Sequence, residues 1–274
     1  MINNELSPQE LAQAAAKVIA ERTGVERHDI ALTLGSGWGG AAELIGDVVC
    51  EIDASEIPGF HAAAVVGHRG KITSIKLASG HHALVLGART HYYEGKGVRA
   101  VAHGVRTAAA CGAKVCILTN GCGSTVPDWG PGTAVLIKDH LNLTATSPIE
   151  GAHFVDLTDA YSSRLRELAH TIDSELPEGV YTQFPGPHYE TPAEVKMARI
   201  LGGDLVGMST ALETIAATEA GMEVLGISLV TNHAAGFAPS KLNHQEVLEA
   251  GKAAGPRISR LLADIIERIS TDAL

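Results

Sequence analysis

The sequence predicts a three-layer α/β protein in which helices flank a mixed, largely parallel central sheet. Short apolar runs typical of strands alternate with amphipathic helical segments along most of the chain. Several of these strands end in glycine-rich or hydroxyl-bearing junctions, as expected at the carboxyl edge of a parallel sheet. Two strands flank a Ser79–Gly80 turn, which adds an antiparallel hairpin. Because no repeat, linker or low-complexity tract interrupts the pattern, we expect one domain over residues 1–274.

Capping signals mark the helix ends. Ser7 and Glu10 form a capping box that opens the first helix, and Gly24 ends it. Thr191 and Glu194 form a second box, with proline at the first helical position. The other expected strands are at 30–34, 72–77, 83–86, 115–119, 133–137, 180–184, 205–207 and 225–230, and the other expected helices are at 98–111, 159–175 and 211–220. A last long helix ends the chain, with Asn243 as its cap and Leu261, Ile265 and Ile269 on its buried side.

Composition limits the partners and the compartment. The formal net charge is −10 and no Lys/Arg run occurs, which argues against nucleic acid or an anionic membrane surface as a partner. The four cysteines show no C-x-x-C spacing and are interpreted as reduced thiols. We find no basic and apolar leader at the N-terminus and no apolar run of transmembrane length. The sequence therefore predicts a cytoplasmic protein.

Four strand ends carry groups suited to an anion. Ser36 lies between two glycines after the first strand, and Gly121 lies in a glycine turn after the strand at 115–119. Arg89 and His91 share one face of an extended segment, and Ser209 follows the strand at 205–207. Each feature alone is explained equally well by a tight turn or a surface side chain. Together they predict one phosphate pocket at the carboxyl edge of the sheet.

The loop before the second capping box offers a different chemistry. Tyr189 and Glu190 lie between the stiff Pro185–Pro187 turn and the helix start, so an aromatic face and a carboxylate are held together. On this segment alone, a capped helix preceded by an exposed glutamate is the simpler interpretation. Its position at a strand–helix junction makes it a candidate ligand-binding loop.

Two other chemistries are less well supported. The chain has 13 histidines but no H-E-x-x-H and no carboxylate–histidine cluster at ligand spacing, so we expect no metal. A serine hydrolase is also disfavoured, because the Gly35-Ser36-Gly37 turn is not a G-x-S-x-G elbow.

Eight short blocks together resemble the signature of the trimeric purine nucleoside phosphorylases. They occur in the family's order over most of the chain, which makes the resemblance much more specific than any one block. The blocks are Leu34-Gly35-Ser36-Gly37, Gly67-His68, the segment from Gly87 to Gly95, Leu118-Thr119-Asn120, the segment from Lys138 to Asn142, the segment from Gly186 to Thr191, the segment from Gly207 to Thr210, and Val230-Thr231-Asn232.

The resemblance implies an enzyme that needs no metal or organic cofactor. Family members cleave 6-oxopurine nucleosides such as inosine and guanosine, and their deoxy forms, with orthophosphate, giving free purine and α-pentose 1-phosphate. Matching positions imply phosphate ligands at Ser36, His68, Arg89, His91, Gly121 and Ser209. They imply nucleoside contacts at Tyr93, Phe154, Tyr189, Glu190, Met208, Asn232 and His244. Among these, His91, Glu190 and Asn232 would act in catalysis.

The resemblance also implies a homotrimer. Phe154 matches an aromatic residue that reaches into the neighbouring subunit's site. The chain departs from the family at three places: Tyr189 stands where some members have phenylalanine, His233 where many have lysine or an apolar residue, and Gly121-Cys122 where two alanines are usual. The first two departures leave the preference among oxopurines open, and the third leaves the loop geometry open.

Three alternative functions remain. A methylthioadenosine phosphorylase of the same fold would be favoured by aspartate at 232 and an apolar pocket at 244, where this chain has Asn232 and His244. A non-catalytic nucleoside or phosphate sensor would be expected to lose Arg89, His91 or Asn232, and all three are present. A hydrolase that uses water is disfavoured by the density of phosphate donors.

Overall fold

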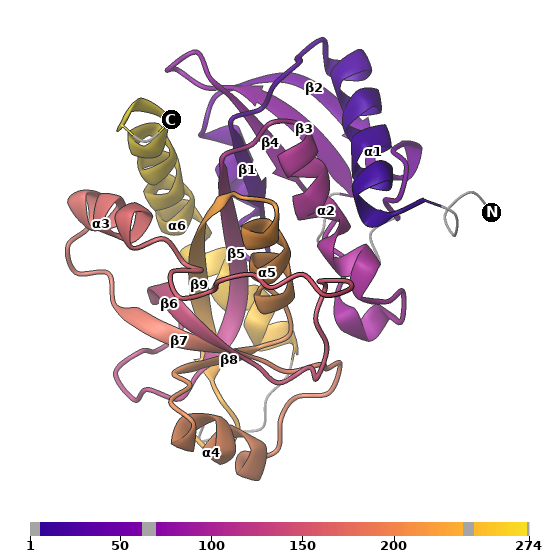
Figure 1. Cartoon of the computed structure of the whole chain (residues 1–274). Helices are drawn as coiled ribbons and strands as arrows, with labels where there is room; N and C mark the ends of the chain where they lie inside the picture. Colours follow the sequence, from indigo (N-terminus) through magenta and orange to yellow (C-terminus); the bar gives the residue numbers. More distant parts are fainter. Residues whose placement is uncertain (1–5, 62–69, 238–243, 273) are drawn as a thin grey trace.

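The computed structural model describes residues 6–61, 70–237, 244–272 and 274, and within them the strands form one mixed sheet (Figure 1). Its strands are β1 (Ile30–Thr33), β2 (Asp47–Asp53), β3 (Lys71–Lys76), β4 (His82–Leu86), β5 (Val115–Ser124), β6 (Ala134–Asn142), β7 (Glu178–Gln183), β8 (Leu205–Gly207) and β9 (Glu223–His233). The predicted mixed α/β architecture is confirmed. Strand β2 was not predicted; it lies at the edge of the sheet, and its residues, of which only Ile52 is buried, do not alternate between apolar and polar.

The strands are arranged in the order β2-β3-β4-β1-β5-β8-β7-β6-β9. The β3–β4 hairpin pairs antiparallel as predicted, and β1 lies between β4 and β5 in parallel with both. Strand β9 pairs with β6 and also with β5. The half of the sheet from β5 to β9 therefore closes into a small barrel, which the strand pattern did not predict.

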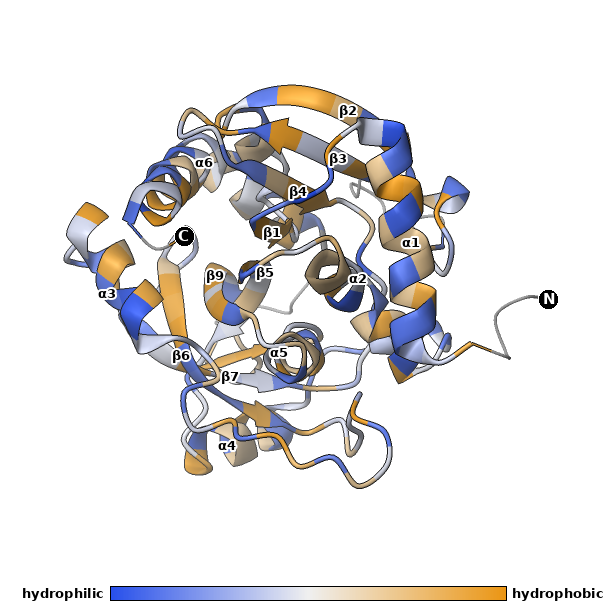
Figure 2. Cartoon of the chain, turned by 45° about the horizontal axis from the view of Figure 1, so that its top comes forward, coloured by the Kyte–Doolittle hydropathy of each residue, from blue (hydrophilic) through white to orange (hydrophobic). Residues whose placement is uncertain are grey.

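Helices cover both faces of the sheet (Figure 2). They are α1 (Pro8–Thr23), α2 (Val98–Ala110), α3 (Ser163–Ile172), α4 (Pro192–Ile200), α5 (Ala211–Glu219) and α6 (His244–Asp272), with short 3₁₀ helices at Gly39–Glu43, Ala54–Glu56 and Tyr92–Glu94. Both predicted capping boxes are present, and Gly24 ends α1 in the left-handed conformation with φ 69°. Asn243, the predicted cap of α6, lies outside the described residues.

The two main apolar cores lie on opposite faces of the sheet, and alternate strand residues contribute to each. Ala31 and Leu118 pack on the face covered by α1, α2 and α5, whereas Leu32 and Ile117 pack on the face covered by α3 and α6. The predicted stripe of α6 belongs to the second core, because Leu261, Ile265 and Ile269 are all buried there. A third, smaller core joins α4 to the barrel. Together these cores hold the strand ends that form the site.

Several predicted boundaries were wrong: β6 and β9 continue to Asn142 and His233 instead of ending at 137 and 230, and two other differences concern a helix and a glycine turn. The helix predicted at 159–175 covers only Ser163–Ile172, because the Ser162 hydroxyl accepts from the Leu165 amide and starts the helix there. Gly121 and Gly123 lie inside β5 instead of in a turn after it, since this stretch continues to pair with β8 and β9. Glycine allows β5 to approach β8 closely, because a Cβ at Gly123 would lie only 3.2 Å from Val206 Cγ2.

Three further observations on the described residues concern disulfides, membrane-spanning helices and metal sites. All four cysteines lie within them and none is in a disulfide. Their helices include none that is both long and apolar enough to span a membrane. The same residues contain no group of three or more His, Cys, Asp or Glu side chains placed to hold a metal ion.

Candidate active site

A cavity of about 310 Å³ lies where β5, β8 and β9 meet the loops that follow β1 and β4. The predicted phosphate ligands that line it are Ser36, Arg89, His91, Gly121 and Ser209. The predicted nucleoside contacts that line it are Tyr93, Tyr189, Glu190, Met208 and Asn232. Segments that are far apart in the sequence are therefore brought to one site.

Three predicted residues are not seen at this cavity. Phe154 is 94% exposed on a surface loop of the same chain. His68 lies outside the described residues. His244 begins α6, but only its backbone belongs to the described part of the chain; Val247, in the same turn, lines the cavity.

The parallel pairing of β1 with β4 and β5 explains how the predicted phosphate ligands meet. Ser36 follows β1 and Arg89 follows β4, so both leave neighbouring strands at the same edge of the sheet. Gly35 allows the first loop to lie against β5, because a Cβ there would be 2.6 Å from the Thr119 carbonyl oxygen. Its amide donates to the Thr119 hydroxyl at 3.0 Å, which fixes the loop beside the cavity.

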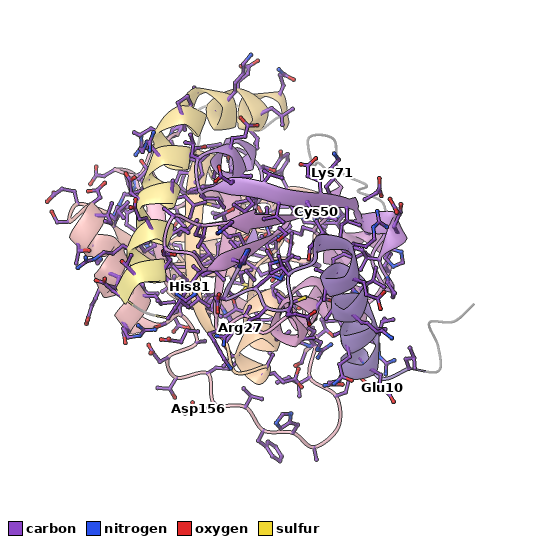
Figure 3. All side chains as sticks on the ribbon, turned by 90° about the horizontal axis from the view of Figure 1, so that it is seen from above. Glu10, Arg27, Cys50, Lys71, His81 and Asp156 are labelled. Atoms are coloured by element: carbon purple, nitrogen blue, oxygen red, sulfur yellow. The ribbon has the colours of Figure 1, made fainter. Side chains whose placement is uncertain are left out.

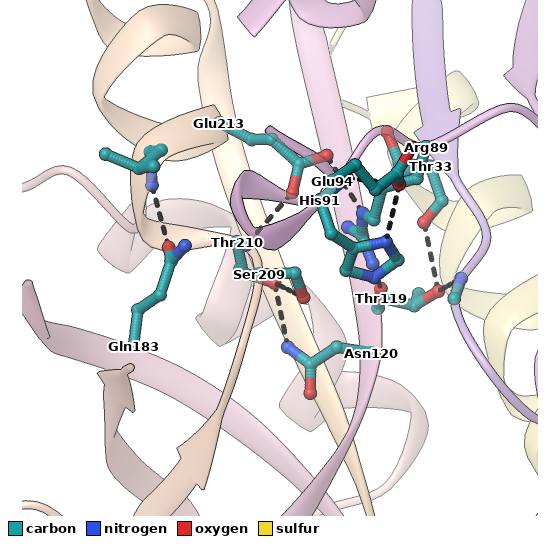
Figure 4. Close-up of polar contacts among 12 residues, drawn as sticks. Thr33, Arg89, His91, Glu94, Thr119, Asn120, Gln183, Ser209, Thr210 and Glu213 are labelled. Carbon is teal, nitrogen blue, oxygen red and sulfur yellow. Dashed lines mark hydrogen bonds and ion pairs between the residues drawn. The ribbon is translucent and has the colours of Figure 1, made fainter. Parts of the chain in front are cut away.

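Arg89 is held by two contacts and keeps one unpaired donor (Figure 4). Its Nε donates to Glu213 Oε1 at 3.0 Å, and its Nη1 donates to the Thr119 carbonyl at 2.7 Å. Its Nη2 is buried without a hydrogen-bond partner among the described residues. A buried donor costs free energy unless it is hydrogen-bonded, so an acceptor bound in the cavity would satisfy it.

His91 is fixed by a nearby carboxylate. Its amide donates to Glu94 Oε1 at 2.8 Å, and its Nδ1 lies 3.4 Å from the same oxygen. Burial opposes charge on Glu94, but hydrogen bonds from the His91 amide and from Lys96 lower its pKa below the ordinary value. The His91 ring stacks on Tyr93, with centroids 4.9 Å apart and an interplanar angle of 14°. The imidazole therefore has a defined orientation at the cavity wall.

The opposite end of the cavity carries a buried carboxylate. Glu190 is 7% exposed, and its Oε1 is buried with no hydrogen-bond partner in the part of the chain that the structure describes. Burial raises the pKa of Glu190 above that of an ordinary glutamate. The simpler interpretation of this position, an exposed glutamate before a helix, is therefore wrong. A ligand that presents an N–H to Oε1 would be selected here.

Asn232 completes this end with an oriented amide. Its Oδ1 accepts from the Thr231 hydroxyl at 2.9 Å, and its Nδ2 donates to the His233 carbonyl at 2.9 Å. An amide nitrogen carries two N–H groups, so one donor remains for a ligand. The cavity thus has hydrogen-bond donors suited to an anion at one end, and one acceptor and one donor, on Glu190 and Asn232, at the other.

The chain matches the phosphorylase superfamily model over residues 29–267. It is 68% identical over 262 residues to a purine nucleoside phosphorylase from Cellulomonas sp, covering 94% of this chain and 93% of that one. The purine nucleoside phosphorylase of Mycobacterium tuberculosis is 54% identical, with coverages of 95% and 97%. The chain belongs to the purine nucleoside phosphorylase family. It is thus an enzyme of the pentosyltransferase class.

Solved purine nucleoside phosphorylases share the fold. Isoform 2 from Schistosoma mansoni, in complex with cytosine and ribose-1-phosphate, superposes with a TM-score of 0.86 at 32% identity. That match covers 95% of this chain and 96% of the other. The S. mansoni enzyme in complex with inosine gives a TM-score of 0.84 at 31% identity, with coverages of 94% and 96%.

Sequence reasoning missed three polar residues that support the site of this purine nucleoside phosphorylase family member. Glu213, Thr119 and Asn120 are buried and bond to Arg89 or Thr210 beside the cavity. A signal for Glu213 was present, since Thr210-x-x-Glu213 has capping-box spacing after the strand at 205–207. Thr119 and Asn120 continue a buried strand, and only the folded chain shows what they contact.

Proposed function

We propose that the protein cleaves 6-oxopurine nucleosides such as inosine and guanosine, and their deoxy forms, with orthophosphate. The products would be the free purine and α-pentose 1-phosphate, and no metal or organic cofactor would be required. The observation that carries this proposal is that two cavity-lining residues, Arg89 with Nη2 and Glu190 with Oε1, bury a polar atom that has no hydrogen-bond partner among the described residues. The named relatives, and neighbours solved with inosine, guanosine and hypoxanthine, support it.

The phosphate end suits a nucleophile that is itself an anion. Phosphate held by Arg89, His91 and Ser36 would attack C1′ as the bond to N9 breaks, so no enzyme nucleophile is needed. Its negative charge would also stabilise the cationic character that develops on the sugar. Positioning and preorganised donors supply the rate enhancement in such a site.

The base end suits a purine that leaves as an anion. The remaining Asn232 N–H can donate to N7, where negative charge develops during bond cleavage. Glu190 Oε1 can accept from the N1–H that hypoxanthine and guanine carry, whereas adenine presents a lone pair there. A buried site of this kind can reject the wrong base by roughly 10⁴-fold or more, because its polar groups are left unpaired.

The test is to incubate the protein with inosine or adenosine, with and without phosphate, and to identify the products. We expect hypoxanthine and ribose 1-phosphate from inosine only when phosphate is present. Free ribose without phosphate would indicate a hydrolase, and binding without turnover would indicate a sensor. Preferential cleavage of adenosine would contradict the proposed role of Glu190.

The protonation of Glu190 should set the acid limb of activity. The raised pKa means that this carboxylate takes up a proton at a higher pH than an ordinary glutamate. Protonation removes the acceptor for N1–H, so kcat/KM for inosine should fall as pH decreases through that pKa. Measured at saturating phosphate, this limb should disappear in Glu190→Gln, whose lower activity should be nearly flat over the same range. An identical acid limb in the variant would assign the titration to another group.

We also propose a cytoplasmic homotrimer in which Phe154 completes the site of a neighbouring subunit. The loop that carries Asp156 runs outside the packed helices and strands (Figure 3), and the exposed Phe154 belongs to it. Arg106 Nη2 donates to the Pro148 carbonyl at 2.7 Å, and Arg99 Nη2 donates to Glu150 at 2.6 Å. These contacts hold the loop, which supports a role in assembly for its aromatic side chain.

Replacing Phe154 with alanine should separate assembly from catalysis. We expect Phe154→Ala to remain trimeric, because one side chain at the end of the loop is removed, while KM for inosine rises and KM for phosphate changes little. Sedimentation velocity and steady-state kinetics on the same sample would measure both. A wild-type monomer that is fully active at assay concentration would refute the proposed shared site.

A further inference from the structure

Glu213 connects two walls of the cavity without lining it. It lies in the first turn of α5, and its side chain is 4% exposed. Its Oε1 accepts from Arg89 Nε at 3.0 Å, and its Oε2 accepts from the Thr210 amide at 2.9 Å (Figure 4). One carboxylate therefore holds the residue after β4 and the residue before α5 at fixed separation.

The contact with Glu213 determines which donor Arg89 can offer. Nε is used by Glu213 and Nη1 by the Thr119 carbonyl, so the planar guanidinium has a single orientation. In that orientation the unpaired donor is Nη2, and Arg89 lines the cavity. The Glu213 charge also compensates a guanidinium whose side chain is only 2% exposed.

The contact with Thr210 secures an unfavourable backbone conformation. Thr210 has φ 84°, a region that residues with a side chain rarely occupy. Its hydroxyl lies 3.0 Å from the Ser209 hydroxyl and accepts from Asn120 Nδ2 at 3.0 Å. The amide bond to Glu213 is thus one of the contacts that hold Ser209 at the cavity wall.

We propose that Glu213 is a positioning residue for orthophosphate, setting Arg89 and Ser209 in the relative geometry that one phosphate ion requires. This inference rests on the proposed phosphate site. A carboxylate can serve both donors because it presents only acceptors. Glutamine presents one acceptor and one donor group, so Glu213→Gln would leave either Arg89 Nε or the Thr210 amide facing an N–H. Aspartate keeps the charge but is one methylene shorter, so it cannot span both contacts.

Two effects of Glu213→Gln act in opposite directions. Removing a negative charge near the cavity would tighten phosphate binding if electrostatics alone decided the outcome. Losing a buried acceptor would let the guanidinium and the Ser209 turn move apart, which would weaken binding. Misplacement of about 1 Å can cost on the order of 100-fold in a positioned site, so we expect geometry to prevail.

The experiment titrates inorganic phosphate into the protein by calorimetry, without nucleoside, and then measures both KM values. We expect Glu213→Gln and Glu213→Asp each to raise the phosphate Kd and KM by roughly 10- to 100-fold, with KM for inosine nearly unchanged. Glu219→Gln is the matched control, because Glu219 is on the same helix and pairs with the buried Arg106 outside the cavity lining. It should lose comparable thermal stability and keep its phosphate affinity.

Tighter or unchanged phosphate binding in both Glu213 variants would overturn the proposal, as would equal increases in both KM values. If the glutamine variant does not fold, the aspartate variant alone decides, because wild-type affinity there would show that charge suffices. A wild-type protein that binds phosphate and leaves inosine intact would refute the proposed function and leave the role of Glu213 testable by calorimetry.

Discussion

Replacing Arg89 with alanine should remove on the order of 2–4 kcal/mol of transition-state stabilisation. The guanidinium supplies the buried Nη2 that we assign to phosphate, and no other arginine or lysine side chain of the described residues lines the cavity. The apparent phosphate KM should therefore rise far more than the inosine KM. Steady-state kinetics with each substrate varied at saturating concentrations of the other would measure the difference.

This substitution also leaves Glu213 buried without its arginine. Removing one partner of a buried ion pair typically costs about 3–5 kcal/mol of stability, so folding must be checked by thermal denaturation. Arg106→Ala is the matched control, because Arg106 is equally buried and pairs with Glu219 away from the cavity. It should be destabilised similarly and retain the phosphate KM, which is the only value compared because Arg106 also contacts the loop that carries Phe154.

Arg89→Lys provides a milder second variant. Lysine keeps the charge, but one ammonium cannot reproduce the planar fork that meets Glu213, the Thr119 carbonyl and an anion together. We expect a smaller loss in the same direction. Equal increases in both KM values, or turnover that persists without phosphate, would be incompatible with Arg89 as a phosphate ligand.

Local signals in the sequence were sufficient to predict those elements whose structure is determined within a single segment. The capping boxes at Ser7 and Thr191 fix helix starts through side chain to amide bonds three residues apart, and both are present. The Ser79–Gly80 turn likewise fixed the β3–β4 hairpin. Apolar periodicity was sufficient for α6, whose buried stripe faces the second core.

Features that depend on long-range pairing were not predictable in this way. Gly121-Cys122-Gly123 has the composition of a turn, yet β9 pairs with Gly121 and both β8 and β9 pair with Gly123, so the stretch remains in a strand. Closure of the barrel depends on β9 pairing on both sides, which no single strand encodes. The cavity residues were predicted largely through the resemblance. The contact of Glu213 with Arg89 was not predictable because the two residues are 124 positions apart, whereas its contact with Thr210 has capping-box spacing.

Changing Asn232 to aspartate should shift base preference from inosine toward adenosine. In the structure Asn232 Nδ2 faces the His233 carbonyl at 2.9 Å, so an ionised carboxylate there would meet an oxygen. The aspartate would lose the N–H proposed for N7 and would repel O6 of inosine, whereas the 6-amino group of adenosine could donate to it. We expect kcat/KM for inosine to fall about 100-fold or more and that for adenosine to rise.

The introduced acid should also make both reactions pH-dependent. Burial and the carbonyl contact would raise its pKa, so a protonated fraction could still donate to N7. Glu190 opposes the switch because its carboxylate still disfavours adenine N1, and Glu190→Gln in the same chain should therefore push the ratio further toward adenosine. Asn232→Ala is the control that removes the donor without adding an acceptor for the 6-amino group. The decisive measurement is kcat/KM for both nucleosides at saturating phosphate across pH. An unchanged inosine-to-adenosine ratio in Asn232→Asp would place the 6-position of the purine away from Asn232.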